Sequence, residues 1–128
     1  MTLRIVRLGS PRHPGEGTRI GAVRRLPRGV SKARYAADDW LDVWLPDLSP
    51  SPELLARGRA ARTDAEWDAF ARAFRAEMER PTPRRTLDLL AALSHDAHFA
   101  LGCYCEDESR CHRSVLRALL QQRGAKIA

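Results

Sequence analysis

The sequence has no long hydrophobic run, few aromatic residues and only three cysteines. No apolar stretch in the 128 residues approaches the roughly 20 residues that a membrane-spanning helix needs. The first ten residues, MTLRIVRLGS, place arginines inside a short apolar stretch, which is typical of a strand and not of a signal peptide. An odd number of cysteines without an export signal indicates reduced thiols. We therefore expect a cytoplasmic protein without a membrane segment or a disulfide framework.

The overall composition is that of a globular protein. Apolar residues make up 44% of the chain and charged residues 30%. A chain of 128 residues is long enough for one core that buries roughly two thirds of the unfolded surface. The sequence predicts a single domain over residues 1–128.

The positive charge is concentrated near the beginning of the chain. Residues 1–35 carry nine arginines and lysines against one acidic residue, a net charge of +8, whereas residues 36–128 carry thirteen basic and fifteen acidic residues. Guanidinium groups in the stretch 23–34, VRRLPRGVSKAR, match phosphate oxygens. A solvated arginine-rich loop is the alternative, because Tyr35 is the one aromatic residue close by that could stack on a base, and no nucleic-acid-binding motif is recognisable.

Four stretches have the character of strands. Residues 3–8 and 19–24 have strand composition, and a Pro/Gly-rich loop over residues 10–18 separates them. Residues 39–46 alternate in character, which suits a strand with two unlike faces or an extended segment. Residues 97–105 form a nearly unbroken apolar run, as expected for the buried central strand of a parallel sheet.

Helical periodicity begins after the third of these stretches. A short helix is expected from Pro52, with Gly58 ending it. Residues 63–81 begin with Thr and Glu at capping-box spacing and place their aromatic residues on one face, which we interpret as core and not as a cofactor site. Residues 82–94 predict another helix, with Thr82 as its N-cap.

The order of these elements predicts a small α/β fold. Strands come first, helices lie between the later strands, and a last helix over residues 110–124 follows the final strand. This order indicates a single-domain, Rossmann-like, mostly parallel sheet flanked by helices. Ligands bind such sheets outside the carboxyl ends of the strands. Cys103 and Cys105 end the buried strand, and Cys111 and His112 open the helix behind it, so this cluster occupies the expected site.

Two binding chemistries for the cysteine cluster can be weighed from its neighbours. A phosphate-binding nucleophile is excluded, because Glu106 and two further acidic residues follow Cys105 and repel a phosphate. A zinc site would use Cys103 or Cys105 with Cys111 and His112. Strand alternation and helix divergence make it hard for four such groups to converge, and flanking arginines oppose a cation. We therefore expect a metal-free protein, with Cys111 the most easily alkylated thiol and Cys103 the least.

The third chemistry is a reactive or sensing thiol. Cys111 stands near a helix N-terminus between Arg110 and Arg113, so the helix dipole and both charges favour its thiolate. His112 would carry the proton, and Arg113 would anchor an anionic substrate or pair with Glu106 or Asp107. A structural role is the alternative, in which the polar residues cap the helix and the thiols fill space.

Three motifs resemble a known family. They are RLPRGVSK (25–32), WLPDLSPS (44–51) and CYCEDESRCHRSVL (103–116). Through them the whole chain resembles the bacterial proteins grouped as domain of unknown function 488 (DUF488). The resemblance implies a small α/β fold of Rossmann-like character and candidate residues, but no named reaction. Two positions depart from the family pattern: Val23 replaces an acidic residue often found in the second strand, and Cys105 adds a potential ligand.

These observations predict one polar site where residues 25–32 meet the Cys-His-Arg loop. The candidate catalytic residues are Cys111, His112 and Arg113. The candidate ligand-binding residues are Arg24, Arg28, Ser31, Lys32, Cys103, Cys105 and Glu106. The leading hypothesis is an enzyme or ligand-binding protein for a small anionic or nucleotide-like compound. The alternative is a nucleic-acid-associated module that uses the basic first 35 residues.

Overall fold

The computed structural model describes residues 1–128 and consists of four strands, four α-helices and three short 3₁₀ helices. The strands are β1 (Leu3–Arg7), β2 (Thr18–Gly21), β3 (Val43–Trp44) and β4 (Phe99–Cys103). The α-helices are α1 (Pro52–Ala60), α2 (Asp64–Met78), α3 (Pro81–Leu93) and α4 (His112–Gln122). The 3₁₀ helices are η1 (Lys32–Arg34), η2 (Pro46–Leu48) and η3 (Glu108–Arg110). None of the helices has the length and apolar character needed to cross a bilayer.

The strands form one sheet in the order β1-β4-β2-β3, and every pair of neighbours is parallel. The central strand β4 is buried along its whole length, as its apolar run predicts. The predicted small α/β fold with a parallel sheet is therefore confirmed. Because all strands run in one direction, their carboxyl ends meet at one edge of the sheet.

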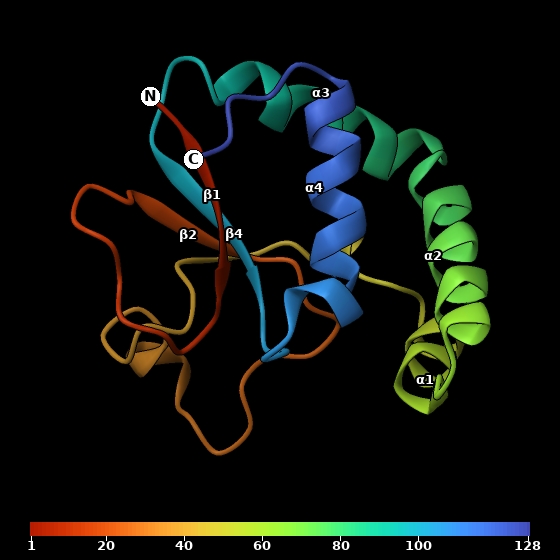
Figure 1. Cartoon of the computed structure of the whole chain (residues 1–128). Helices are drawn as coiled ribbons and strands as arrows, with labels where there is room; N and C mark the ends of the chain where they lie inside the picture. The colour runs from red at the N-terminus through yellow and green to blue at the C-terminus, as the bar shows by residue number, and fades with distance from the viewer.

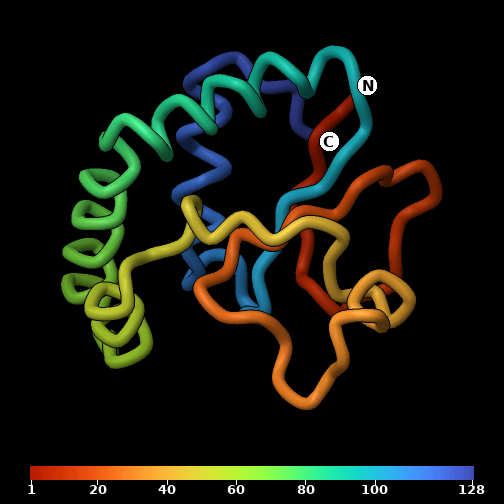
Figure 2. Tube along the Cα trace, turned by 180° about the vertical axis from the view of Figure 1, so that it is seen from behind, coloured from red at the N-terminus to blue at the C-terminus, as the bar shows by residue number.

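All four α-helices lie on one side of the sheet, and α4 lies nearest to the strands (Figure 1). The main core is the cluster of 17 buried residues between these helices and the strands, and Phe74, Leu101 and Leu116 are among its most enclosed members. The ends of the chain lie close together beside β1 (Figure 2). The backbone N–H of Ala128 donates to the carbonyl oxygen of Leu3, which fixes the C-terminal residues against the sheet.

Several predicted helix boundaries are wrong: α2 ends at Met78 and not at residue 81, and α4 begins at His112 and not at residue 110, because Glu108–Arg110 form η3. Helix α1 continues past Gly58 to Ala60. This glycine serves packing, because a Cβ atom at position 58 would lie 2.7 Å from a ring carbon of Phe70 on α2. Helix α3 begins at Pro81, not after a Thr82 N-cap, because a proline with its fixed φ and missing N–H already suits the first helical position.

The stretch 39–46 forms much less strand than its alternation predicts. Only Val43–Trp44 pairs with the sheet, and Asp39 has a positive φ of 63°. The carbonyl oxygen of Asp39 accepts hydrogen bonds from the backbone N–H of Gly9 and from the Arg19 guanidinium, so the chain turns here before it extends. Strand β2 likewise ends at Gly21, three residues before the predicted end of the 19–24 stretch.

Candidate functional site

The candidate site lies at the carboxyl ends of the strands, where the loop after β4 passes the loop after β2 (Figure 1). Cys103 is the last residue of β4, and Cys111 directly precedes α4. The hydroxyl of Tyr104 donates to the carbonyl oxygen of Arg25 over 2.8 Å. The segment 25–32 therefore contacts the cysteine loop through its first residue, Arg25, as expected.

The cysteine cluster converges more closely than the sequence suggests. The ligand atoms of Cys103, Cys111 and His112 all lie within 4.8 Å of one another, and the Cys105 sulfur lies 3.9 Å from the Cys103 sulfur. The expectation that helix divergence would separate Cys111 from His112 is wrong. Cys111 is the N-cap of α4 and has extended backbone angles, φ −129° and ψ 150°, so only His112 has entered the helix. These three groups are close enough to hold a metal ion.

The imidazole of His112 is buried and oriented by the backbone of β2. Its Nε2 lies 2.7 Å from the carbonyl oxygen of Ala22, and its Nδ1 lies 3.8 Å from the Cys111 sulfur. Because a carbonyl oxygen can only accept a hydrogen bond, Nε2 carries the proton in the neutral ring. The lone pair of Nδ1 therefore faces the cysteine cluster. The ring also packs edge-on against Phe74, with centroids 5.5 Å apart.

Arg113 supports the cluster from behind. Its backbone N–H and its Nε lie 3.5 and 3.4 Å from the Cys111 sulfur, and its Nη2 donates to the carbonyl oxygen of Cys105 over 2.5 Å. The alternative that Arg113 pairs with Glu106 or Asp107 is wrong, because Glu106 lies 3.6 Å from Arg7 and Asp107 accepts hydrogen bonds from Ser109. Arg113 is buried and holds the shape of the loop, and it does not line the cavity described below.

The three thiols differ in exposure and in acidity. Hydrogen bonds to the other two sulfurs, together with burial, raise the pKa of Cys103 above its ordinary value. Hydrogen bonds from Cys103 and Cys111, helped by Arg113 and Arg59 and opposed by burial, lower the pKa of Cys105 to about 3. A hydrogen bond from Cys103, helped by His112 and opposed by Cys105 and burial, lowers the pKa of Cys111.

The exposed thiol is Cys105, while Cys111 is only 2% exposed and Cys103 6%. The expectation that Cys111 is the most easily alkylated thiol and Cys103 the least disagrees with this exposure, because Cys111 is the most enclosed of the three. Its side chain folds inward because its sulfur accepts the N–H of Arg113 and so caps the helix. The negative charge of the cluster is best placed on Cys105, at the surface that faces the cavity.

A cavity of about 370 Å³ lies above the cluster, between the sheet edge and helices α1 and α2. Cys103, Cys105, Cys111 and His112 contribute to one part of its lining. Its aromatic lining residues are Trp67, Phe70 and Tyr104. Its arginines are Arg24, Arg25, Arg59 and Arg110. Burial raises the pKa of Tyr104 to about 12, so this phenol stays neutral.

The arginines around the cavity have different partners. Arg24 donates to the carbonyl oxygens of Ser49 and Pro50. Arg110 pairs with a carboxylate at the start of α2 and covers the Trp67 ring at 5.8 Å from its centroid. Arg25 and Arg59 form no ion pair with a carboxylate. They are therefore the guanidinium groups available to an anionic ligand.

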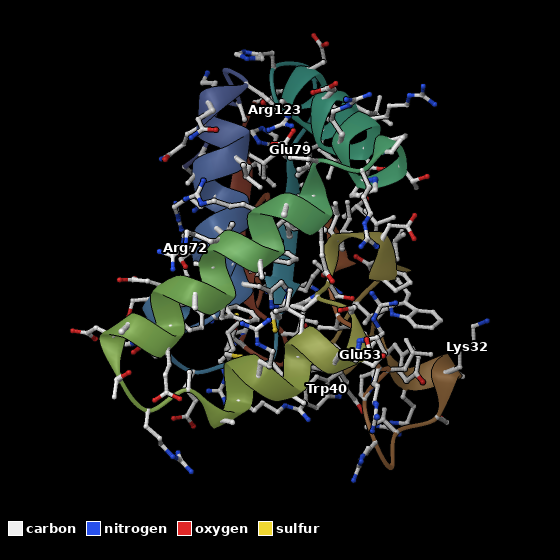
Figure 3. The ribbon with its side chains drawn as sticks, turned by 90° about the vertical axis from the view of Figure 1, so that its right-hand side faces the viewer. Lys32, Trp40, Glu53, Arg72, Glu79 and Arg123 are labelled. Atoms are coloured by element: carbon white, nitrogen blue, oxygen red, sulfur yellow. The ribbon has the colours of Figure 1, made fainter.

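A second, more open cavity of about 620 Å³ adjoins the first, and the two share Arg59 and Tyr104. Arg28 lines this second cavity. Ser31 and Lys32 line neither cavity, and the Lys32 side chain points outward at the edge of the molecule (Figure 3). The predicted ligand-binding set is thus divided: Arg24 and the cysteines share one cavity, Arg28 lies in the next, and Ser31 and Lys32 lie outside both.

The sequence did not predict that α1 and α2 form one wall of the 370 Å³ cavity. The prediction that the aromatic stripe of α2 is core is confirmed, because Phe70 belongs to the main core and Trp67 packs against it, but both residues also line the cavity, and Arg59 was not predicted to do so. A stripe of apolar residues looks the same in a sequence whether it covers a core or a cavity. Gly58 was the available signal, since it marks the close approach of the two helices.

The basic segment 1–35 offers less free positive charge than its composition suggests. Four of its basic residues form ion pairs, three of them with acidic residues that lie beyond residue 35. The pairs are Arg7–Glu106, Arg12–Asp42, Arg19–Glu16 and Arg34–Asp38. Arg28 and Lys32 form no such pair.

Comparison with known proteins agrees with the motifs and the fold. A family model described as the active DUF488-N3 subclade matches residues 3–124. Searches of curated proteins and of solved structures give no match. Because the family model covers nearly the whole chain, the protein belongs to the DUF488 family, in its active DUF488-N3 subclade.

Proposed function

We propose that this protein is an enzyme, or an enzyme-like binding protein, for a small anionic compound with a flat ring, such as a nucleotide-like compound. The observation that carries the proposal is the lining of the 370 Å³ cavity, which combines aromatic rings, unpaired arginines and the cysteine cluster. Flat rings stack on aromatic side chains, and guanidinium groups match phosphate or carboxylate oxygens. The cavity volume lies in the usual range for small-molecule pockets, about 300–1,000 Å³.

The cysteine cluster is the reactive centre of this proposed site. Arginines stay charged at all physiological pH values, and Tyr104, with a pKa of about 12, stays neutral. The sulfur atoms of the cysteines and the imidazole of His112 are the lining groups that can donate electron pairs to a bound compound. Cys105 is the exposed sulfur that reaches a bound compound, while Arg113 is a positioning residue. The description of the matching subclade as active is consistent with such a centre.

Ligand titration tests the proposal. We expect nucleoside monophosphates to quench the fluorescence of Trp67, which lines the cavity, more strongly than nucleosides or inorganic phosphate do. Arg59→Ala should weaken this binding about tenfold, equivalent to ~1.4 kcal/mol, because it removes one charged contact. Arg57→Ala is the matched control, since Arg57 is exposed on the same helix, does not line the cavity and forms no ion pair.

Equal affinities of the Arg59→Ala and Arg57→Ala variants would contradict the proposed site. The nucleic-acid alternative predicts a different result. Binding of a single-stranded polynucleotide would fall steeply as salt rises, and the double variant Arg28→Ala, Lys32→Ala would weaken it, because phosphate contacts release counterions. Unchanged polynucleotide binding in that double variant would remove the alternative.

A further inference from the structure

We propose that Cys103, Cys111 and His112 form a binding site for a soft divalent metal ion of the zinc type, with Cys105 as the fourth ligand. The ligand atoms of the first three residues lie within 4.8 Å of one another, and all three residues are buried. Thiolate sulfur and imidazole nitrogen are the donor atoms that zinc prefers in tetrahedral sites.

The spacing of the donor atoms suits tetrahedral coordination. Two thiolates bound to one zinc at about 2.3 Å lie about 3.8 Å apart, and a thiolate and an imidazole nitrogen about 3.6 Å apart. The observed separations are 3.9 Å between the sulfurs of Cys103 and Cys105, and 3.8 Å between the Cys111 sulfur and the His112 Nδ1. Cys103, Cys111 and His112 are thus close to the geometry of a common ion, whereas the exposed Cys105 side chain lies outside this group of three and would have to move to complete the tetrahedron.

The orientation of His112 is an independent argument for a ligand at this place. Its Nε2–H donates to the carbonyl oxygen of Ala22 over 2.7 Å, so the lone pair of Nδ1 is directed toward the sulfurs. Metal-binding histidines generally donate their other ring N–H to a carbonyl or carboxylate in this way. A histidine that only filled space would not need a fixed tautomer facing the thiols of Cys103 and Cys111.

The surroundings supply the outer contacts and the charge balance of a metal–thiolate centre. The backbone N–H and Nε of Arg113 lie 3.5 and 3.4 Å from the Cys111 sulfur, which is the position of hydrogen bonds to a metal-bound thiolate. Three thiolates and one divalent ion carry one net negative charge. Arg113, which is hydrogen-bonded to Cys105 and Cys111, and Arg59, which lines the same cavity as Cys105, favour that charge. Arg113, one of the two flanking arginines expected to oppose a cation, thus stabilises its complex.

The four ligands are not equivalent. Cys103, Cys111 and His112 are buried, whereas Cys105 is exposed and lines the cavity. Four protein ligands, three thiolates and one imidazole, are a set typical of structural zinc sites, whereas reactive zinc sites keep one coordination position open. Here the one exposed ligand, Cys105, lies toward the cavity. Cys105 is therefore the ligand that exchanges when a compound enters the cavity.

Cobalt(II) titration of the chelator-treated protein tests this site. We expect one equivalent to bind with the absorption bands of tetrahedral cobalt and a thiolate-to-cobalt charge-transfer band, and zinc to displace it. Cys103→Ser and Cys111→Ser should weaken binding by more than about a hundredfold, because even outer contacts of metal ligands contribute about 10- to 100-fold. Cys105→Ser should still bind cobalt in a tetrahedral site, and its thiolate-to-cobalt charge-transfer band should be weaker because one thiolate ligand is missing.

His13→Gln is the matched control, because His13 is exposed and distant in sequence from the cluster, and it should leave the spectrum unchanged. An octahedral spectrum, or no spectrum, from the wild-type protein would overturn the proposal without any variant having to fold. Loss of binding in Cys105→Ser but not in Cys103→Ser would overturn the ligand assignment. Fluorescence titration of nucleoside monophosphates needs no metal, so the two proposals can fail separately.

Discussion

Replacing Glu16 by glutamine should destabilise this fold more than any exposed charge change, because Glu16 neutralises a fully buried arginine. Arg19 on β2 has no exposed surface. Its Nε and Nη2 donate to the two carboxylate oxygens of Glu16 over 2.8 and 3.0 Å, and its Nη1 donates to the carbonyl oxygens of Ser10 and Asp39. The Glu16→Gln change keeps the size of the side chain and removes its charge.

The expected loss is about 3–5 kcal/mol, the usual cost of leaving one partner of a buried ion pair uncompensated. This is a large share of the roughly 5–15 kcal/mol that stabilises a typical domain. Urea denaturation followed by circular dichroism at pH 7 measures it. Asp38→Asn is the control, because it breaks the exposed Arg34–Asp38 pair and should barely move the urea midpoint. Similar midpoints for the two variants would refute the reasoning.

The same pair predicts how stability changes with pH. Burial raises the pKa of Glu16, but hydrogen bonds from Arg19 and from the backbone N–H of His13 outweigh it, so the folded-state pKa lies below the usual value. A lowered folded-state pKa gives stability that is present above the unfolded pKa of about 4.3 and is lost as pH falls through the folded value. We expect the free energy of unfolding of Glu16→Gln to fall less steeply below pH ~4.3 than that of the wild type.

Two further predictions concern the cavity and its thiols. Gly58→Ala should lower the urea midpoint, because the new Cβ atom would lie 2.7 Å from a carbon of the enclosed Phe70 ring. Such overpacking costs about 1–3 kcal/mol, more than the roughly 1 kcal/mol that alanine gains over glycine in helix propensity. A raised midpoint would contradict this. Brief alkylation of the native, chelator-treated protein should modify Cys105 before Cys103 and Cys111, because only Cys105 is exposed. Mass spectrometry of the digested protein identifies the modified cysteine. Alkylation of Cys111 before Cys105 would contradict the structure.

Elements with strong local signals are predictable from the sequence. The apolar run before Cys103 became the central strand β4, because a strand buried on both faces needs an apolar side chain at nearly every position. Helix α2 begins where the capping box places it: the Thr63 side chain accepts the backbone N–H of Glu66. Such signals depend on residues three or four positions apart and need no knowledge of the fold.

The geometry of the candidate site is less predictable, because it depends on the backbone of one residue and on distant partners. Cys111 joins the cluster because its extended conformation turns the side chain back toward β4. Part of the positive charge of residues 1–35 is compensated, because Asp42 pairs with Arg12 and Asp38 pairs with Arg34. Neither effect follows from counting charges or from helical periodicity.

Arg110 shows how the wall and the base of the cavity depend on each other. The sequence places it beside Cys111, where it was expected to favour the thiolate. In the structure it instead pairs with Asp64 at the start of α2 and lies 5.8 Å from the centroid of the Trp67 ring. The short η3 segment that ends at Arg110 therefore joins the cysteine loop to the helix that closes the cavity. Because Arg110 also lines the cavity, this one residue connects the cysteine loop, the helix wall and the space between them.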